Sequence, residues 1–254
     1  MIRKLAALGL GGLVAAAALS ISSQASAEDK FGVAGGMVIS ADRMFGIHMN
    51  SVTRTEKDAA TGVEGETKGS TTSIALLWNS QGSGDTLNVS QIPRLSFDYF
   101  VIDGLSVGGS LGYASLSGKY KQTKPQESPE TDLPSTSAFA FAPRVGYAIM
   151  FTDMIGIWPR GGITYWSSKT ESKSQTTPVV TTTDKTSGLD LNIEGMLVIV
   201  PAPHFAFTLG PVIDFGLTGS SETERSPDPN PAPKNDITLK HTNFGLAFGL
   251  LGYF

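Results

Sequence analysis

The chain has 254 residues, and its 19 Lys and Arg against 23 Asp and Glu give a formal charge of −4. An acidic chain is a poor ligand for a phosphate backbone, so we expect no nucleic-acid partner. The sequence contains no cysteine, which excludes disulfides, thiolate metal sites and a lipid-modified cysteine.

The first 27 residues have the pattern of a secretory signal peptide. Arg3 and Lys4 precede a long apolar run, and a small-residue A-x-A cleavage site ends at Ala27. We expect residues 1–27 to be removed, with a retained membrane anchor as the alternative. The mature chain, 28–254, loses both early basic residues, and its formal charge becomes −6. It contains no apolar run of about 20 residues, so any membrane span in it must be a strand.

The first ninety residues contain one long alternating segment, Met37–Val52. Its apolar side chains share one face, on which Arg43 is the exception, and Asp42, His48 and Asn50 lie on the other face. This period of two predicts a strand with one face toward lipid and one toward a lumen. Polar segment 55–70 then predicts a loop, and 71–79 is a weaker apolar segment.

From Ile92 onward the alternation is regular, and it predicts seven strands. Six of them form three hairpins with short turns, of which Asp103-Gly104 is the tightest. The expected turns are at residues 103–104, 151–154 and 201–204, and long polar loops are expected at 119–135, 171–187 and 220–236. Short turns that alternate with long loops are typical of an outer-membrane barrel, in which the short turns face the periplasm.

The closing strand, Asn243–Phe254, has large apolar residues on one face and mainly glycine and alanine on the other. The seven later strands need one or three more from the first ninety residues, so that both ends of the chain share the periplasmic side. We favour one, which gives an antiparallel up-and-down barrel of eight strands spanning 28–254. Segment 71–79 then pairs with the upper half of the first strand. The ten-strand alternative needs a turn near Asp42 and a long polar loop in the periplasm.

These features together resemble the small bacterial outer-membrane β-barrel proteins of the OmpA and OmpX type. The resemblance is architectural, covers the whole mature chain, and includes a terminal aromatic residue, Phe254, like the one that the barrel-assembly machinery reads. It implies an outer-membrane location, contact with outer-membrane lipid, and a structural, adhesive or protective role through extracellular loops. A periplasmic domain after the barrel is not expected. We expect a monomer, and the sequence names no extracellular ligand.

Charged residues within the strands form the candidate site. Seven of them are predicted to face the lumen, three basic and four acidic: Arg94, Asp98, Arg144, Arg160, Asp190, Glu194 and Asp214. Unpaired charges in a narrow interior are costly, so we expect a mutually neutralising network that fills the lumen. A selectivity constriction in a small-solute channel is the alternative.

No pattern in the sequence predicts a metal site, a cofactor or enzymatic activity. A hydrolytic site in a barrel of this class needs a histidine close to a serine or a carboxylate. The nearest approach is His48 with Asp42 and Asn50, which share a strand face at different heights. His204 is expected in a turn and His241 near a strand start, without neighbours that suggest catalysis.

Overall fold

The structure, a computed structural model, describes residues 30–76, 89–120, 131–174, 179–228 and 235–254. The expected signal peptide, 1–27, lies outside these residues, as does the end of segment 71–79. The described elements are strands apart from one short 3-10 helix, η1 (Val89–Gln91).

Within the described part of the chain, no helix is long and apolar enough to cross a membrane.

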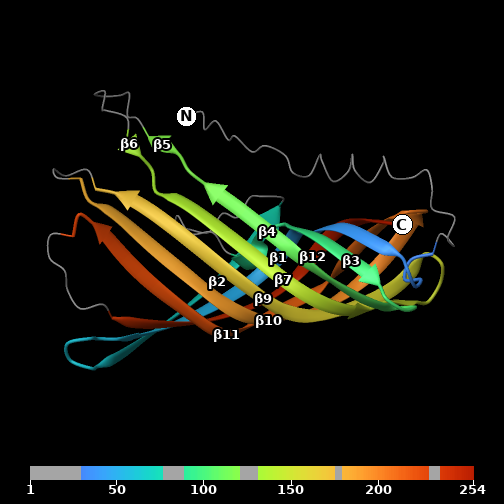
Figure 1. Cartoon of the computed structure of the whole chain (residues 1–254), viewed down its shortest axis with the longest axis horizontal. Coiled ribbons are helices and arrows are strands. Elements are labelled where there is room, and N and C mark those ends of the chain that lie inside the picture. The colour runs from blue at the N-terminus through green and yellow to red at the C-terminus, as the bar shows by residue number, and fades with distance from the viewer. Residues whose placement is uncertain (1–29, 77–88, 121–130, 175–178, 229–234) are drawn as a thin grey trace.

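The strands are antiparallel and follow one another around a ring (Figure 1). Their bounds are β1 (Met37–Lys57), β2 (Glu64–Leu76), β3 (Arg94–Phe100), β4 (Leu105–Leu116), β5 (Lys119–Tyr120), β6 (Thr131–Asp132), β7 (Ser135–Tyr147), β8 (Ile149–Met150), β9 (Ile155–Lys173), β10 (Thr181–Ala202), β11 (Phe205–Ser226) and β12 (Asp236–Tyr253).

Eight strand positions close the ring, in the order β1-β3-β4-β7-β9-β10-β11-β12, and β12 pairs back onto β1. The eight-stranded barrel predicted from the sequence is therefore confirmed. β1 runs through Asp42 without a turn, so the ten-strand alternative does not occur. The two-residue strand β8 continues the position of β7, because both pair with β9.

β2 and β3 share one position beside β1. The first part of β1, Met37–Asp42, pairs with β3, and the rest, Phe45–Lys57, pairs with β2. This confirms that segment 71–76 lies against the upper half of β1. The expectation of a loop over 55–70 was wrong, because the turn between β1 and β2 covers only 58–63. Paired strands satisfy backbone hydrogen bonds whether their side chains are polar or apolar, so polarity alone did not identify them.

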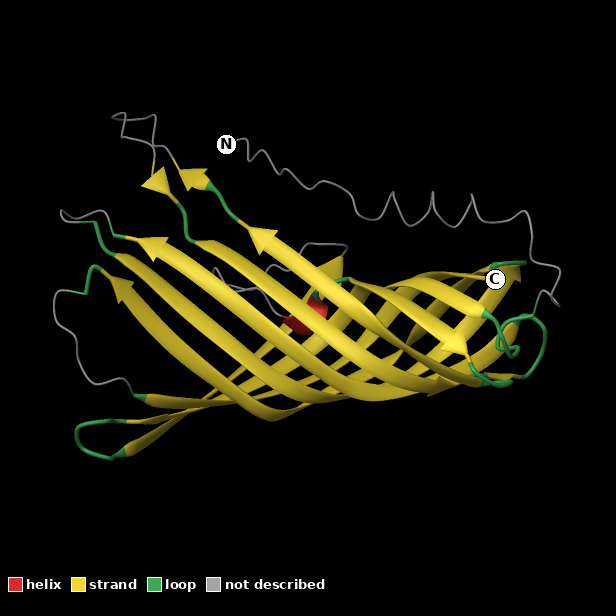
Figure 2. Cartoon of the chain, viewed as in Figure 1, coloured by secondary structure: helices red, strands yellow, loops and turns green. Residues whose placement is uncertain are grey.

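The two ends of the barrel differ in the length of their connections. One end, called here the short-turn end, carries the turns at 101–104, 151–154 and 203–204 and the chain end at Phe254; it is at the right in Figure 1. At the opposite long-loop end the strands project by different lengths (Figure 2). β9, β10 and β11 extend far into the regions predicted as loops 171–187 and 220–236. Those two loops are therefore shorter than the sequence suggested.

Along the regular parts of the barrel strands, side chains alternate between the interior and the outside. In β7 the small residues Ala138, Ala140 and Ala142 point inward and are buried, whereas Phe139 and Phe141 point outward and are exposed. The same outward pattern continues around the ring as a band of exposed apolar side chains that includes Leu95, Phe97, Val107, Leu111, Val145, Ile157, Ile163, Leu191, Ile193, Leu209, Phe215, Phe244 and Leu246. A continuous apolar band of this kind is the surface that a bilayer covers.

Candidate functional site: the barrel lumen

The lumen is crossed by a layer of buried charges, which we call the charge layer. Seven residues contribute to it from six strands: Asp42 and Arg43 from β1, Asp98 from β3, Arg144 from β7, Arg160 from β9, Glu194 from β10 and Asp214 from β11. Each is at most 4% exposed. Alternation along the strands turns most of these side chains inward, and the register between strands brings them together, although most of these residues are far apart in sequence.

Arg144 and Arg43 each hold two carboxylates. Arg144 donates from Nη2 and Nε to Asp98, at 2.6 and 3.0 Å, and from Nη1 to Asp42 at 2.6 Å. Arg43 donates to both oxygens of Asp214 at 2.9 Å and to Glu194 Oε1 at 3.1 Å. Such two-pronged contacts are the strongest geometry for a guanidinium and a carboxylate.

Arg160 links the charge layer to the aromatic residues beneath it. Its Nη2 lies 2.6 Å from Glu194 Oε2, in an ion pair whose angles are not those of a hydrogen bond, and its Nη1 lies 3.4 Å from Asp42 Oδ2. The guanidinium stands 4.7 Å from the ring centroid of Trp158. A cation over an aromatic face is attracted to it, so this arginine is stabilised from two sides.

Arg43 reaches the lumen through a break in the strand register. The ladder with β12 jumps from Ala41–Leu250 to Phe45–Phe248, so three residues of β1 stand opposite one of β12. Arg43 adopts a φ of 56° in this bulge, and both Asp42 and Arg43 point inward. The assignment of Arg43 to the lipid face was therefore wrong. A single charge on an otherwise apolar face was the signal of a bulge, since a bulge can turn one side chain inward.

The seven residues predicted to line the lumen are all buried there, but they form two groups. Asp98, Arg144, Arg160, Glu194 and Asp214 lie in the charge layer. Arg94 and Asp190 form no ion pair with its members within the described part of the chain. Among the described residues no carboxylate pairs with Arg94, whose Nη1 is 3.5 Å from Thr164 Oγ1. Asp190 pairs instead with His241. The two network members that the prediction omitted are Asp42 and Arg43.

An aromatic layer fills the barrel below the charge layer, at the short-turn end. Phe31, from the segment before β1, makes edge-to-face contacts with three rings, Phe100, Trp158 and Tyr253, at centroid distances of 5.3–5.6 Å. Backbone hydrogen bonds tie this segment to the neighbouring turns, including Gly104 N to Gly32 O at 2.7 Å. The segment before β1 therefore closes the bottom of the barrel.

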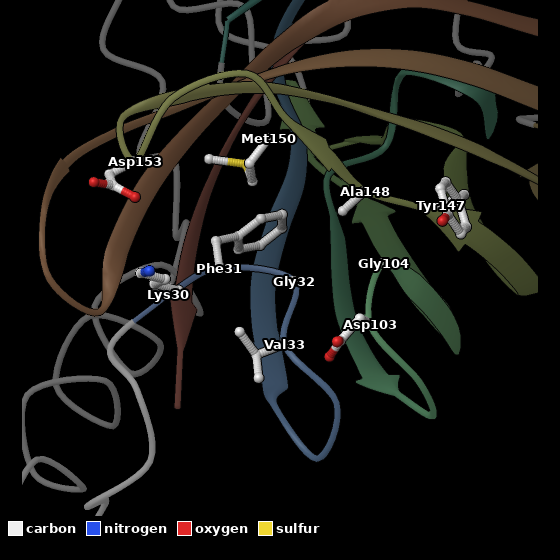
Figure 3. A pocket seen from close by; sticks show the side chains of 10 residues that line it. All are labelled: Lys30, Phe31, Gly32, Val33, Asp103, Gly104, Tyr147, Ala148, Met150 and Asp153. Carbon is white, nitrogen blue, oxygen red and sulfur yellow. The ribbon is translucent and has the colours of Figure 1, made fainter.

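A hollow of about 280 Å³ opens beside Phe31 at the same end. Figure 3 shows that it is lined by Lys30, Phe31 and Val33 and by the turns that carry Asp103 and Asp153. Asp103 uses a carboxylate oxygen to accept a hydrogen bond from Ala34 N at 2.8 Å, so it holds the segment in place.

A third set of buried polar side chains, the upper lumen layer, lies on the long-loop side of the charge layer. It consists of Asn50, Ser90, Trp166, Asp190 and His241. Ser90 belongs to η1, whose backbone is anchored in the lumen because Arg43 Nη1 donates to Ser90 O at 2.9 Å. Trp166 also points inward and is 8% exposed.

The structure separates the residues that came nearest to a catalytic set in the sequence. His48 is 3.3 Å from Asn243 Oδ1, whereas Asp42 is held by Ser96 and Arg144 in the charge layer. The histidine that does meet a serine and a carboxylate is His241, which the sequence left without neighbours. Its partners come from η1 and β10, so no local spacing could have shown them.

No family model matches the sequence, and no curated protein matches it. Among solved structures, the chain is similar to the outer membrane protein OprG from Pseudomonas aeruginosa, with a TM-score of 0.51, 12% identity, and coverage of 87% of this chain and 97% of that one. For the outer membrane protease OmpT from Escherichia coli the TM-score is 0.43 and the identity 8%, with coverage of 86% of this chain and 97% of that one. For the attachment invasion locus protein Ail of Yersinia pestis the TM-score is 0.30 and the identity 13%, with coverage of 85% of this chain and 99% of that one.

The TM-scores for OmpT and Ail are too low to support a comparison of details. The similarity to OprG, at 12% identity, is a similarity of fold. Together with the closed ring of eight strands and its outward apolar band, that likeness fixes the architecture. This chain has the fold of the small outer-membrane β-barrel proteins.

Proposed function

We propose that the mature chain is an integral protein of the bacterial outer membrane, closed to solutes, that acts through the parts projecting beyond the membrane. Its apolar outer band supports insertion in a bilayer, and its fold is that of outer-membrane barrels. The short-turn end then faces the periplasm and the long-loop end faces the outside. Removal of residues 1–27 as a signal peptide is part of the proposal.

The observation that carries the proposal is the double closure of the lumen. The charge layer spans the interior with seven ion-pair contacts between three arginines and four carboxylates, and the aromatic layer fills the space beneath it. Ion pairs and packed rings leave little room for a continuous column of water. We therefore favour a structural or surface-interaction role over that of a small-solute channel.

The projecting parts are the surfaces available for this role. No residue of β1 from Ser51 onward is buried, and the tip of the hairpin with β2 is exposed at 59–63. Outer-membrane lipid and the barrel-assembly machinery are the proposed partners, the latter through Phe254, and the monomeric state remains a prediction. This role requires no catalysis, and the expectation that the chain is not an enzyme also remains a prediction.

Planar bilayers test the closure directly. Refolded mature protein is expected to show no steady conductance, while migrating faster on a gel when unheated than when boiled, because closed barrels resist detergent. Cell fractionation should recover it with the outer membrane. A steady, ion-selective conductance that Glu194→Ala alters without unfolding the barrel would show that the charge layer lines an open pore.

Surface labelling tests the orientation. The chain has no cysteine, so single cysteines at Ala60, in the tip of the β1–β2 hairpin, and at Ile102, in a short turn, can be compared without background. A membrane-impermeant maleimide should label Ala60→Cys on intact cells and Ile102→Cys only after the outer membrane is permeabilised. The reverse pattern would overturn the proposed orientation.

A further inference from the structure

Three side chains of the upper lumen layer form a connected chain of contacts. Ser90 Oγ lies 3.3 Å from His241 Nε2, and His241 Nδ1 lies 3.3 Å from Asp190 Oδ2. Ser90 and Asp190 are 2% and 3% exposed, and the His241 side chain is 12% exposed. A serine, a histidine and a carboxylate in this order are the arrangement that activates a serine hydroxyl for attack.

The carboxylate determines which imidazole nitrogen carries the proton. An ionised Asp190 only accepts hydrogen bonds, so Nδ1 of a neutral His241 must carry the proton that it donates to Asp190. Nε2 is then a free acceptor that faces the Ser90 hydroxyl. Asn50 Oδ1 also lies 3.4 Å from Nε2, but an amide oxygen cannot donate a proton to it, so it does not replace Ser90 in this tautomer.

The surroundings supply an apolar wall and a positive charge. Trp166 stands edge-on to His241 at 6.1 Å, and it packs with Ala140 and Leu239 in a small buried cluster against which Val89 also lies. Arg94 contacts Thr164, the cross-strand neighbour of Asp190, so its guanidinium lies at the height of this layer. Its Nε has no hydrogen-bond partner among the described residues.

We propose that Ser90, His241 and Asp190 form a nucleophilic site for acyl transfer, with small esters that carry a compact apolar acyl group as its substrate class. Ser90 and His241 are the reacting groups, and Asp190 is a positioning residue. The apolar cluster receives the acyl group, and the charge of Arg94 favours the oxyanion. Because the charge layer closes the lumen below, substrate arrives from the long-loop end; this direction rests on the proposed function.

The step is balanced within these groups. Ser90 Oγ forms a bond to the ester carbonyl carbon while its proton passes to His241 Nε2. The bond from that carbon to the alcohol oxygen then breaks, and the alcohol leaves with the proton from His241. Water repeats the sequence on the acyl-serine: it gives its proton to His241, attacks the carbonyl carbon, and releases the carboxylic acid as Ser90 recovers its proton.

A fluorophosphonate probe and p-nitrophenyl acetate test the site on refolded mature protein in detergent. We expect mass spectrometry to find the adduct on Ser90, and Ser90→Ala to abolish it. His241→Gln should slow labelling about a hundredfold and Asp190→Asn at least about tenfold, in line with the loss of a base and of its positioning group. Ser110→Ala, a change at another buried inward serine, is the matched control and should label like the wild type.

A purely structural role, in which the contacts of Ser90, His241 and Asp190 only tether η1 to the barrel wall, predicts no adduct on Ser90. The labelling experiment therefore separates a structural role from a catalytic one. Each variant is first shown to be folded by its heat-dependent gel shift. Folded wild-type protein that gives no Ser90 adduct, or that labels equally after His241→Gln, would overturn the proposal and leave the expectation of no enzymatic activity standing. Labelling is done in detergent, so this failure is distinct from failure of the membrane location or of the closed lumen.

Discussion

The two halves of this barrel share most of their strands but are stabilised in different ways. At the short-turn end, inward side chains form the aromatic layer and the charge layer, and residues such as Trp158 and Val38 are fully buried. At the long-loop end, β1 and β2 continue as a hairpin in which no residue of β1 from Ser51 onward is buried. Backbone pairing is therefore enough to extend a strand beyond the barrel, whereas the burial of side chains determines which half contributes most of the free energy of unfolding.

Loss of Glu194 should be the most damaging change to the buried half. Its two oxygens contact Arg43 at 3.1 Å and Arg160 at 2.6 Å, so Glu194→Ala removes the closest carboxylate of Arg160 and one of the two carboxylates that hold Arg43 in a closed layer. We expect a loss of about 3–5 kcal/mol in the free energy of unfolding, measured by urea titration in detergent. Glu66→Ala, at an exposed ion pair with Lys68, is the control and should cost less than about 1 kcal/mol. Equal losses would contradict the contrast between the halves.

Shortening the exposed hairpin should have a much smaller effect. Arg54 and Thr67 face each other across β1 and β2, so the twelve residues 55–66 can be replaced by Asn-Gly, which suits a two-residue hairpin turn. We expect the free energy of unfolding to change by less than about 1 kcal/mol, because the removed residues bury little surface. A loss as large as that of Glu194→Ala would show that the projecting strands also hold the barrel together.

The smallest effect is expected at the tip of that hairpin. Asp58 Oδ1 accepts hydrogen bonds from Thr61 Oγ1 at 2.8 Å and from the backbone nitrogens of Thr61 and Ala60 at 2.7 and 3.0 Å. The Thr61 hydroxyl, with these amides, holds the pKa of Asp58 below its ordinary value of 3.8. The turn is therefore favoured above that ordinary value, and this contribution is lost as the pH falls through the lowered pKa of the folded state.

Thr61→Val should raise the pKa of Asp58 toward its ordinary value, because it removes the hydroxyl donor and keeps the shape of the side chain. An NMR titration of the Asp58 carboxyl carbon measures this shift. Thr67→Val, at an exposed strand position of the same hairpin, should leave the pKa of Asp58 unchanged. If the pKa of Asp58 is the same in the wild type and in both variants, the turn does not persist in solution.

The strands within the membrane band were predictable because a period of two survives wherever one face meets lipid. That is why the eight positions, the short turns and the burial of Glu194 could be read from the sequence. The long-loop end could not, since strands that project into water on both sides lose the alternation on which the reading depends. Segment 55–70 and much of 171–187 were therefore taken for loops.

Residues whose position depends on a local irregularity or on distant pairing could not be placed either. Arg43 breaks the parity rule because the bulge turns its side chain inward, and a period of two carries no information about bulges beyond the misplaced charge itself. Ser90, Asp190 and His241 lie on three elements separated by long stretches of chain. Their meeting follows from the closure of the ring, which no spacing in the sequence encodes.

The charge layer also constrains the way in which the barrel can assemble. Arg43 and Asp214 are 171 residues apart in the chain, and Asp42 and Arg144 are 102 apart. Among neighbouring strands only β9 and β10 bring one ion pair of the charge layer together, Arg160 with Glu194. The other inward charges of an isolated hairpin would be exposed to hydrocarbon if it entered a bilayer alone. The charges of β1 are satisfied only when this strand lies across the lumen from β7, β10 and β11. The strands of this chain should accordingly insert together rather than one hairpin at a time. Insertion should also be slow, because contacts between residues distant in sequence slow folding in general.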